Sequence, residues 1–182
     1  EEQKKSFKIF MDTLLEYNKV MNLTTIDEPM EVYTKHFLDS LSCLSIDELK
    51  TQGLKVIDVG TGAGFPSIPI KIIRPDMQMT LLDSLNKKVL FLKEVGNRVG
   101  LENVEYLHSR AEDAGLSSEH REQYDIVLSR AVASLPVLLE YCTPFLKKGG
   151  YFICQKGPSA ELEAEQSKKA LSVLGCSLEY IK

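Results

Sequence analysis

Apolar side chains recur every three or four residues along two stretches near the N-terminus, residues 7–21 and residues 29–44. This spacing places them on one face of an α-helix, so the pattern predicts two amphipathic helices. Asp27 and Pro29 are typical of the first residues of a helix and mark the start of the second one. Residues 1–50 are therefore predicted to form a helical N-terminal subregion.

The pattern changes after residue 50, where short apolar, β-branched runs alternate with helical spacing. The runs predict strands at 55–59, 77–82, 104–107, 125–128, 151–154 and 177–181, and the helical patterns predict helices at 85–99, 135–145 and 159–174. Strands that alternate with helices form a mostly parallel sheet with helices on both faces. Residues 51–182 are thus predicted to be an α/β core, within a single domain overall.

Composition restricts the class of protein. The 182 residues are 43% hydrophobic and 26% charged, as expected for a globular domain. The chain has 22 lysines and arginines against 26 aspartates and glutamates, a net charge of −4. This balance excludes a protein that coats nucleic acid through bulk positive charge, but it allows a local basic face. No apolar run approaches the roughly 20 residues that a membrane-spanning helix needs, so we expect no membrane span.

The cysteines and histidines give no metal-binding pattern. The four cysteines are scattered without a Cys-x-x-Cys pair, and three histidines are available to complete a site. The pattern predicts reduced thiols, no metal ion and a cytoplasmic location.

The segment from Asp58 to Phe65 is a glycine-rich turn after the first predicted strand of the sheet. Its glycines stand at 60, 62 and 64, whereas the dinucleotide fingerprint places its third glycine where this chain has Phe65. Such a turn lets the backbone approach a ligand at the carboxyl edge of a parallel sheet. A nicotinamide-dependent oxidoreductase is therefore disfavoured, and another adenosyl cofactor fits better.

Asp83 ends the second predicted strand, 23 residues beyond Gly60. A carboxylate at this place can accept hydrogen bonds from both hydroxyls of an adenosine ribose, in adenine dinucleotides and in S-adenosylmethionine alike. The alternative role is to cap the helix that starts near Leu85, which Ser84 could do instead. We favour ribose binding because the turn and the acid occur at compatible spacing in one βαβ unit.

Two further strand ends lie on the same rim. Residues 108–113 form an acidic cluster where the adenine would lie, and Ser129 and Arg130 follow the fourth strand. The chain lacks the Asn/Asp-Pro-Pro-aromatic tetrad that would have indicated methylation of an exocyclic amine.

Six motifs together resemble those of class I S-adenosylmethionine-dependent methyltransferases and, more narrowly, those of the RsmG family, also called glucose-inhibited division protein B. They are Asn22-Leu23-Thr24, His36-Phe37-Leu38-Asp39-Ser40, the turn from Asp58 to Pro66, Leu82-Asp83-Ser84, Ser129-Arg130-Ala131 and Lys156-Gly157. The resemblance spans nearly the whole chain. It implies a Rossmann-like bacterial enzyme that methylates N7 of one guanine in 16S ribosomal RNA and releases S-adenosylhomocysteine. Related chains continue past Lys182, so C-terminal strand material is expected to be missing from this sequence.

The residues expected to bind the cofactor come from the resemblance and from the two arguments above. The resemblance implies Gly60, Phe65, Ala111, Glu112 and Arg130, the turn adds Gly62 and Gly64, and the ribose argument adds Asp83. Guanine N7 carries a free lone pair and no proton, so its attack on the sulfonium methyl needs positioning but no general base. The base becomes cationic as it is methylated, which favours carboxylates or carbonyls facing it.

Three residues are candidates for a direct part in catalysis. Arg130 has the best case because it directly follows a buried strand and could contact the cofactor or an RNA phosphate. His36 is a weaker candidate, since a histidine on such a helix is more often a structural hydrogen bonder. Asp39 is expected to pair with Lys35, one helical turn away. The third candidate is Lys156, which ends the fifth strand and overlooks the pocket.

RNA contacts are expected from basic residues near the same rim. The candidates are Lys87, Lys88, Arg98 and Lys156, with Lys71 and Arg74 as weaker ones, and Phe65 is one option for stacking on the target base. The expected partner is 16S ribosomal RNA or the small-subunit particle, bound by a monomer. Two alternatives remain open: a methyltransferase of a small molecule or protein, and a non-catalytic module that binds adenosylmethionine or the ribosome.

Overall fold

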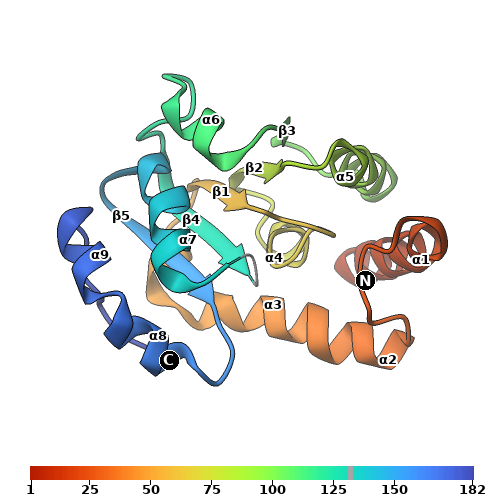
Figure 1. The fold of residues 1–182 in the computed structure, drawn as a ribbon. Helices are drawn as coiled ribbons and strands as arrows, with labels where there is room; N and C mark the ends of the chain where they lie inside the picture. The colour runs from red at the N-terminus through yellow and green to blue at the C-terminus, as the bar shows by residue number, and fades with distance from the viewer. Residues whose placement is uncertain (131–132) are drawn as a thin grey trace.

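A five-stranded parallel sheet forms the centre of the computed structural model, which describes residues 1–130 and 133–182 (Figure 1). The strands lie in the order β3-β2-β1-β4-β5, and every neighbouring pair is parallel. Their bounds are β1 Lys55–Val59, β2 Gln78–Asp83, β3 Val104–His108, β4 Tyr124–Arg130 and β5 Leu146–Gln155. The predicted α/β class and the first five predicted strands are confirmed. The predicted strand at 177–181 is wrong, because these residues form neither helix nor strand.

Helices connect the strands and precede them. Their bounds are α1 Glu2–Met21, α2 Pro29–Glu31, α3 Asp39–Ser42, α4 Ser67–Ile73, α5 Asn86–Val99, α6 Ala111–Leu116, α7 Leu135–Cys142, α8 Ala160–Gln166 and α9 Lys168–Val173. A π-helical segment, Val32–Leu38, joins α2 to α3, so the second predicted helix is continuous but wound more widely at its centre. No helix in the described part of the chain is long and apolar enough to cross a membrane.

Alternate side chains of the sheet enter two separate apolar clusters, one on each face. Val56 of β1 packs in a cluster with residues of α1, α4 and α5, whereas Ile57 and Val59 pack with residues of α6 and α7. Figure 1 shows the same division, with α4 and α5 on one side of the sheet and α7 on the other. This alternation is the period of two that strands impose on their side chains.

The N-terminal helices share the core of the sheet. Phe10 and Leu14 of α1 are fully buried in the cluster that contains Val56. The continuous helix from α2 to α3 then runs along the carboxyl edge of the sheet and delivers His36 and Asp39 to it, as the hydrogen bonds to Arg130 show.

Candidate functional site

The turn after β1 is held against β2 by backbone hydrogen bonds. The amides of Gly60 and Thr61 donate to the carbonyl oxygen of Leu82, at 2.9 and 3.1 Å. Gly60, Gly62 and Gly64 have φ angles of 72°, 61° and 92°, in the left-handed region that favours glycine. At Gly64 a Cβ atom would also lie 2.4 Å from Cδ1 of Ile68. The turn therefore requires glycine for its backbone conformation, and at Gly64 for close packing against α4 as well.

Asp83, at the end of β2, fastens this turn from the side. It is 5% exposed, and its Oδ2 accepts a hydrogen bond from the amide of Gly62 at 3.0 Å. Its Oδ1 accepts from the amide of Leu85 at 2.9 Å, directly before α5. The alternative that Asp83 caps α5 is wrong, because Leu85 is the N-cap residue and the helix has no side-chain cap hydrogen bond; Asp83 only holds the chain before the helix. Each carboxylate oxygen has a second lone pair, so ribose hydroxyls can still donate to it.

Asp58 and Thr61 leave buried polar atoms without partners beside the turn. Asp58 is fully buried, and its Oδ2 accepts a hydrogen bond from the hydroxyl of Ser67. Within residues 1–130 and 133–182, Oδ1 of Asp58 and Oγ1 of Thr61 have no hydrogen-bond partner. Burial raises the pKa of Asp58 to about 7. The hydroxyl of Thr61 lowers the pKa of Asp58 in part, and both oxygens can still pair with a further polar group, so the turn fits a small polar ligand.

Arg130 joins β4 to the N-terminal helix. Its guanidinium donates to Oδ2 of Asp39 at 2.9 Å and to Nδ1 of His36 at 3.1 Å, and it lies 5.0 Å above the ring centre of Phe65. The predicted pair between Asp39 and Lys35 is wrong: Lys35 binds Glu31 at 2.6 Å instead. The physical reason is that the helix lies against the sheet edge, where one arm of the Arg130 guanidinium donates to Asp39 while the other donates to His36.

His36 is neutral and forms hydrogen bonds with two neighbours, Arg130 and Thr24. A guanidinium donates hydrogen bonds and never accepts them, so Nδ1 of His36 holds a lone pair and its proton resides on Nε2. Nε2 then donates to Oγ1 of Thr24 at 2.9 Å. Burial and the charge of Arg130 lower the pKa of His36 to about 4. At neutral pH His36 therefore orients Arg130, and its ring carries no second proton that it could transfer.

Phe65 lies beneath this network. It is 5% exposed and stacks on His36 with ring centres 4.4 Å apart, and it also packs against Phe10 and Phe37. A ring covered in this way leaves no free face for a nucleobase. Phe65 is therefore not a stacking partner for the target base.

Gln155 and Lys156, at the end of β5, serve the rim in different ways. Nε2 of Gln155 donates to the carbonyl oxygen of Asp39 at 2.8 Å, a contact that the sequence analysis missed because it comes from the fold alone. Nζ of Lys156 lies 2.7 Å from Oε2 of Glu163 and 2.9 Å from the carbonyl oxygen of Ala133. Only 13% of the Lys156 side chain is exposed, so its charge is used within the protein.

The other basic candidates all have partners within the chain. Lys87 and Lys88 lie in the first turn of α5; Lys87 donates to the carbonyl oxygen of Met21 at 3.3 Å, and Lys88 lies 3.6 Å from Asp83. Arg98 is held by Glu16 at 2.7 Å and by Glu94 at 2.6 Å. The two weaker candidates are structural: Lys71 donates to backbone carbonyls from a buried position, and Arg74 ties Asp76 to the backbone before β1. Lys87 and Lys88 are therefore the basic pair nearest the glycine turn among the predicted ones.

The remaining predicted cofactor contacts lie after β3. Ala111 and Glu112 begin α6; Ala111 is half-buried, and Glu112 is exposed and 3.7 Å from Arg110. The arrangement brings every predicted cofactor residue to the carboxyl ends of β1 to β4.

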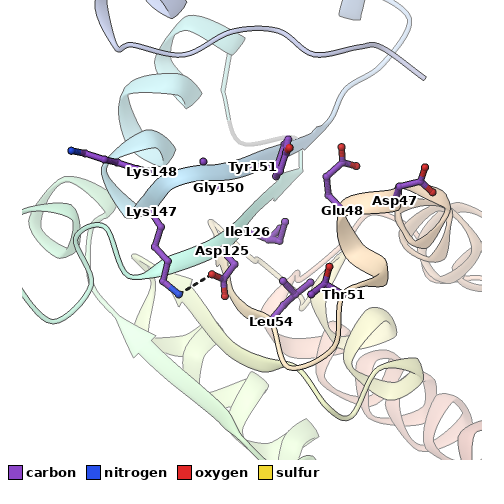
Figure 2. A pocket seen from close by; sticks show the side chains of 11 residues that line it. Asp47, Glu48, Thr51, Leu54, Asp125, Ile126, Lys147, Lys148, Gly150 and Tyr151 are labelled. Carbon is purple, nitrogen blue, oxygen red and sulfur yellow. Dashed lines mark hydrogen bonds and ion pairs between the residues drawn. The ribbon is translucent and has the colours of Figure 1, made fainter.

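A surface hollow lies at the opposite edge of the sheet, where β4 and β5 begin (Figure 2). Asp125 and Lys147 line it and form an ion pair of 2.8 Å, and Tyr151 and Glu48 lie on its other side. No predicted site residue lines this hollow. The two edges of the sheet are thus chemically distinct.

Comparisons with known proteins agree with this geometry. A family model described as GidB, rRNA small subunit methyltransferase G, matches residues 3–182. The ribosomal RNA small subunit methyltransferase G of Alkaliphilus metalliredigens is 59% identical over 166 residues, which cover 91% of this chain and 69% of that protein. The protein of the same name from Desulforamulus reducens is 57% identical over 178 residues, covering 98% of this chain and 74% of the relative.

The solved structures agree at the level of the fold. A SAM-dependent methyltransferase from Aquifex aeolicus superposes with a TM-score of 0.60 at 23% identity, over 85% of this chain and 86% of that one. At this identity the similarity supports the Rossmann-like methyltransferase fold and nothing more specific.

Proposed function

The chain belongs to the rRNA small subunit methyltransferase G family of SAM-dependent methyltransferases, and from this premise we propose that it methylates N7 of one guanine in 16S ribosomal RNA. The observation that carries the proposal is the hydrogen bond from Gly62 to Asp83. It joins the glycine turn and the strand-end carboxylate into one cradle at the carboxyl edge of a parallel sheet, where ligands of such folds bind.

S-adenosylmethionine is the cofactor we propose for this cradle, with no metal ion in the transfer step. The turn from Gly60 to Phe65 would carry the cofactor through its backbone, and the unpartnered oxygens of Asp58 and Thr61 would accept donors from its amino-acid end. Asp83 would accept the ribose hydroxyls, and Ala111 and Glu112 would face the adenine. When bound, the sulfonium supplies an activated methyl group.

The protein's part in the transfer is orientation and charge. Guanine N7 has a lone pair and no proton to lose, so the side chains around it need to align the base and exclude water. Arg130 is the residue we place at the reacting rim, held there by Asp39 and His36. Because His36 stays neutral at physiological pH, we assign it a positioning role and no proton transfer.

The RNA would approach the same rim. Lys87 offers positive charge at the start of α5, and Lys88 lies beside it, 3.6 Å from Asp83. Arg98 and Lys156 form closer ion pairs with carboxylates and contribute less. Phosphate contacts of this kind give affinity and register but no base specificity. We further propose that the protein acts as a monomer in the cytoplasm, on 16S ribosomal RNA or on the small-subunit particle.

The test is transfer of labelled methyl groups from S-adenosylmethionine to small-subunit RNA and particles from a strain that lacks the modification. Guanine methylated at N7 is found by reduction followed by chain scission, which maps the base directly. We expect label at a single guanine that becomes sensitive to scission. Label in protein or small-molecule fractions would favour the alternative substrate classes, and cofactor binding without any acceptor would favour a non-catalytic module.

A further inference from the structure

A second cluster of ionisable side chains lies away from the carboxyl edge of the sheet. Glu105 comes from β3, and Glu119 and His120 come from the loop between α6 and β4. One ring nitrogen of His120 and one carboxylate oxygen of each glutamate lie within 4.8 Å of one another. The imidazole is 5% exposed, whereas both glutamates are exposed. The side chain of His120 thus lies beside two carboxylates that solvent can reach.

A chain of hydrogen bonds fixes the tautomer of His120. Nδ1 of His120 lies 2.8 Å from the hydroxyl of Tyr124, which donates to Oγ1 of Thr80 at 3.2 Å, which in turn donates to Oε2 of Glu105 at 2.8 Å. An ionised carboxylate only accepts, so the Thr80 proton points to Glu105 and the Tyr124 proton points to Thr80. The oxygen of Tyr124 must then accept the proton of Nδ1.

The consequence is a free lone pair on Nε2 of His120. The neutral imidazole has its proton on Nδ1, and among residues 1–130 and 133–182 no hydrogen bond to Nε2 is formed. Metal-binding histidines have this arrangement: one nitrogen is the ligand, and the other donates to a polar group that fixes the ring. Thr80 orients the carboxylate of Glu105 in the same manner.

The charges around the cluster favour a cation. Glu105 and Glu119 contribute two negative charges on the solvent side of the cluster. The ammonium of Lys55 lies 5.0 Å above the ring centre of Tyr124 and offsets one of these two charges. A divalent ion would neutralise the negative charge that is left and bind the free lone pair of Nε2.

We propose that Glu105, Glu119 and His120 bind a divalent transition-metal ion, with Zn²⁺ as the ion that one imidazole and two carboxylates suit best. The exposed glutamates can each move the short distance that tetrahedral coordination requires, and water would complete the shell. The ion would tie β3, an edge strand, to the loop before β4. Its role would be structural, because the cluster lies near the first residues of β3 and β4, at the edge of the sheet opposite the glycine turn.

No sequence pattern indicates this site, because its ligands come from separate elements. Glu105 lies 14 residues before Glu119, and neither occurs in a spacing typical of zinc sites. Parallel pairing of Thr80 with Glu105 and the return of the chain into β4 bring them together. The proposal thus departs from the expectation, drawn from the cysteines and histidines, that the protein binds no metal ion.

Calorimetric titration of the chelator-treated, reduced protein with Zn²⁺ tests the proposal. We expect one equivalent to bind, with an affinity that falls at least about tenfold in Glu119→Gln and in Glu105→Gln. Glu140→Gln, which alters an exposed carboxylate on α7, is the matched control and should bind as the wild type does. Both glutamates of the cluster are exposed, so these variants are expected to fold.

Two further measurements make the outcome decisive. Zn²⁺ should raise the melting temperature of the wild type and of Glu140→Gln more than that of Glu119→Gln. Co²⁺ at the site should give the weak visible bands of nitrogen and oxygen ligands, without the intense thiolate absorption that binding to a cysteine produces. No stoichiometric binding, binding that is equal in all variants, or a thiolate spectrum would each overturn the assignment.

Discussion

Arg130 and Asp39 are 91 residues apart in the chain, and their side chains meet at 2.9 Å at the carboxyl edge of the sheet. The contact joins β4 to the helix that runs from α2 to α3. The same guanidinium reaches His36 and lies over Phe65, so one side chain of β4 contacts three residues that lie outside the strand. The order of this rim therefore depends on Arg130.

Replacement of Arg130 by alanine should lower methyl transfer strongly. Misplacing reacting groups by about 1 Å costs roughly 100-fold in rate, and we expect a loss of at least about that size in the maximal rate. Arg130→Lys should recover only part of it, because an ammonium cannot bind Asp39 and His36 through one planar fork. Arg121→Ala, at an exposed arginine in the loop before β4, is the control and should keep wild-type activity with a similar melting temperature. Wild-type turnover in Arg130→Ala would remove this residue from the site.

Asp39 should act through Arg130. Asp39→Ala frees one arm of the guanidinium from a half-exposed partner, a loss of about 1 kcal/mol that corresponds to roughly fivefold in rate. The maximal rate should fall while the KM for the cofactor changes little. Lys35→Ala breaks the neighbouring ion pair with Glu31 and should leave both values unchanged. An equal effect of the two variants would contradict the role of Asp39.

His36 should remain neutral well below the pH at which histidines usually titrate. Its pKa falls from 6.5 to about 4 on folding, so between these values the unfolded chain binds a proton that the folded chain does not. The contribution of His36 to the free energy of unfolding is thus complete above pH 6.5 and decreases as the pH falls toward 4. NMR titration of the ring should give a midpoint near 4, and a midpoint near 6.5 would contradict the buried, arginine-facing position.

The same reasoning predicts that the loss of stability on mutation of His36 depends on pH. His36→Gln should destabilise the protein more at pH 7.5 than at pH 5, because the wild type has lost part of its advantage at the lower pH. Comparison of variant with wild type is needed, since Asp58 acts in the opposite sense: its raised pKa makes the folded state bind a proton between about pH 4 and 7.

Gly64 should tolerate alanine poorly. A methyl group there would overlap Ile68 and occupy a left-handed backbone conformation, so we expect a loss of about 2 to 4 kcal/mol in the free energy of unfolding. Gly100→Ala is the matched control, because Gly100 also has a positive φ but open space around it. It should lose only about 1 kcal/mol in urea denaturation. Equal losses would show that packing against α4 is unimportant.

Local patterns predicted the secondary structure well, and failed where tertiary contacts decide. The strands before residue 156 follow from β-branched runs, and α5 follows from its apolar face. The helix predicted over 159–174 is interrupted at Ser167, whose hydroxyl binds the carbonyl oxygen of Glu163 at 2.6 Å. The π-helical turn of Val32–Leu38 has no sequence pattern of its own.

The sequence predicts those parts of the site that follow directly from the end of a single strand. The glycine turn and Asp83 lie in consecutive βα units, so their proximity follows from topology. The partner of Asp39 does not, because the i,i+4 rule considers only neighbours on one helix and Arg130 comes from a distant strand. Gln155 and the cluster of Glu105, Glu119 and His120 were missed for the same reason.

A crystal structure with S-adenosylhomocysteine bound tests the central claim most directly. The account predicts the ligand along the backbone of Gly60 to Phe65, with its ribose hydroxyls on Asp83 and its sulfur facing the rim near Arg130. A ligand in the hollow between Asp125 and Glu48, or at any other place away from the carboxyl ends of β1 and β2, would contradict it.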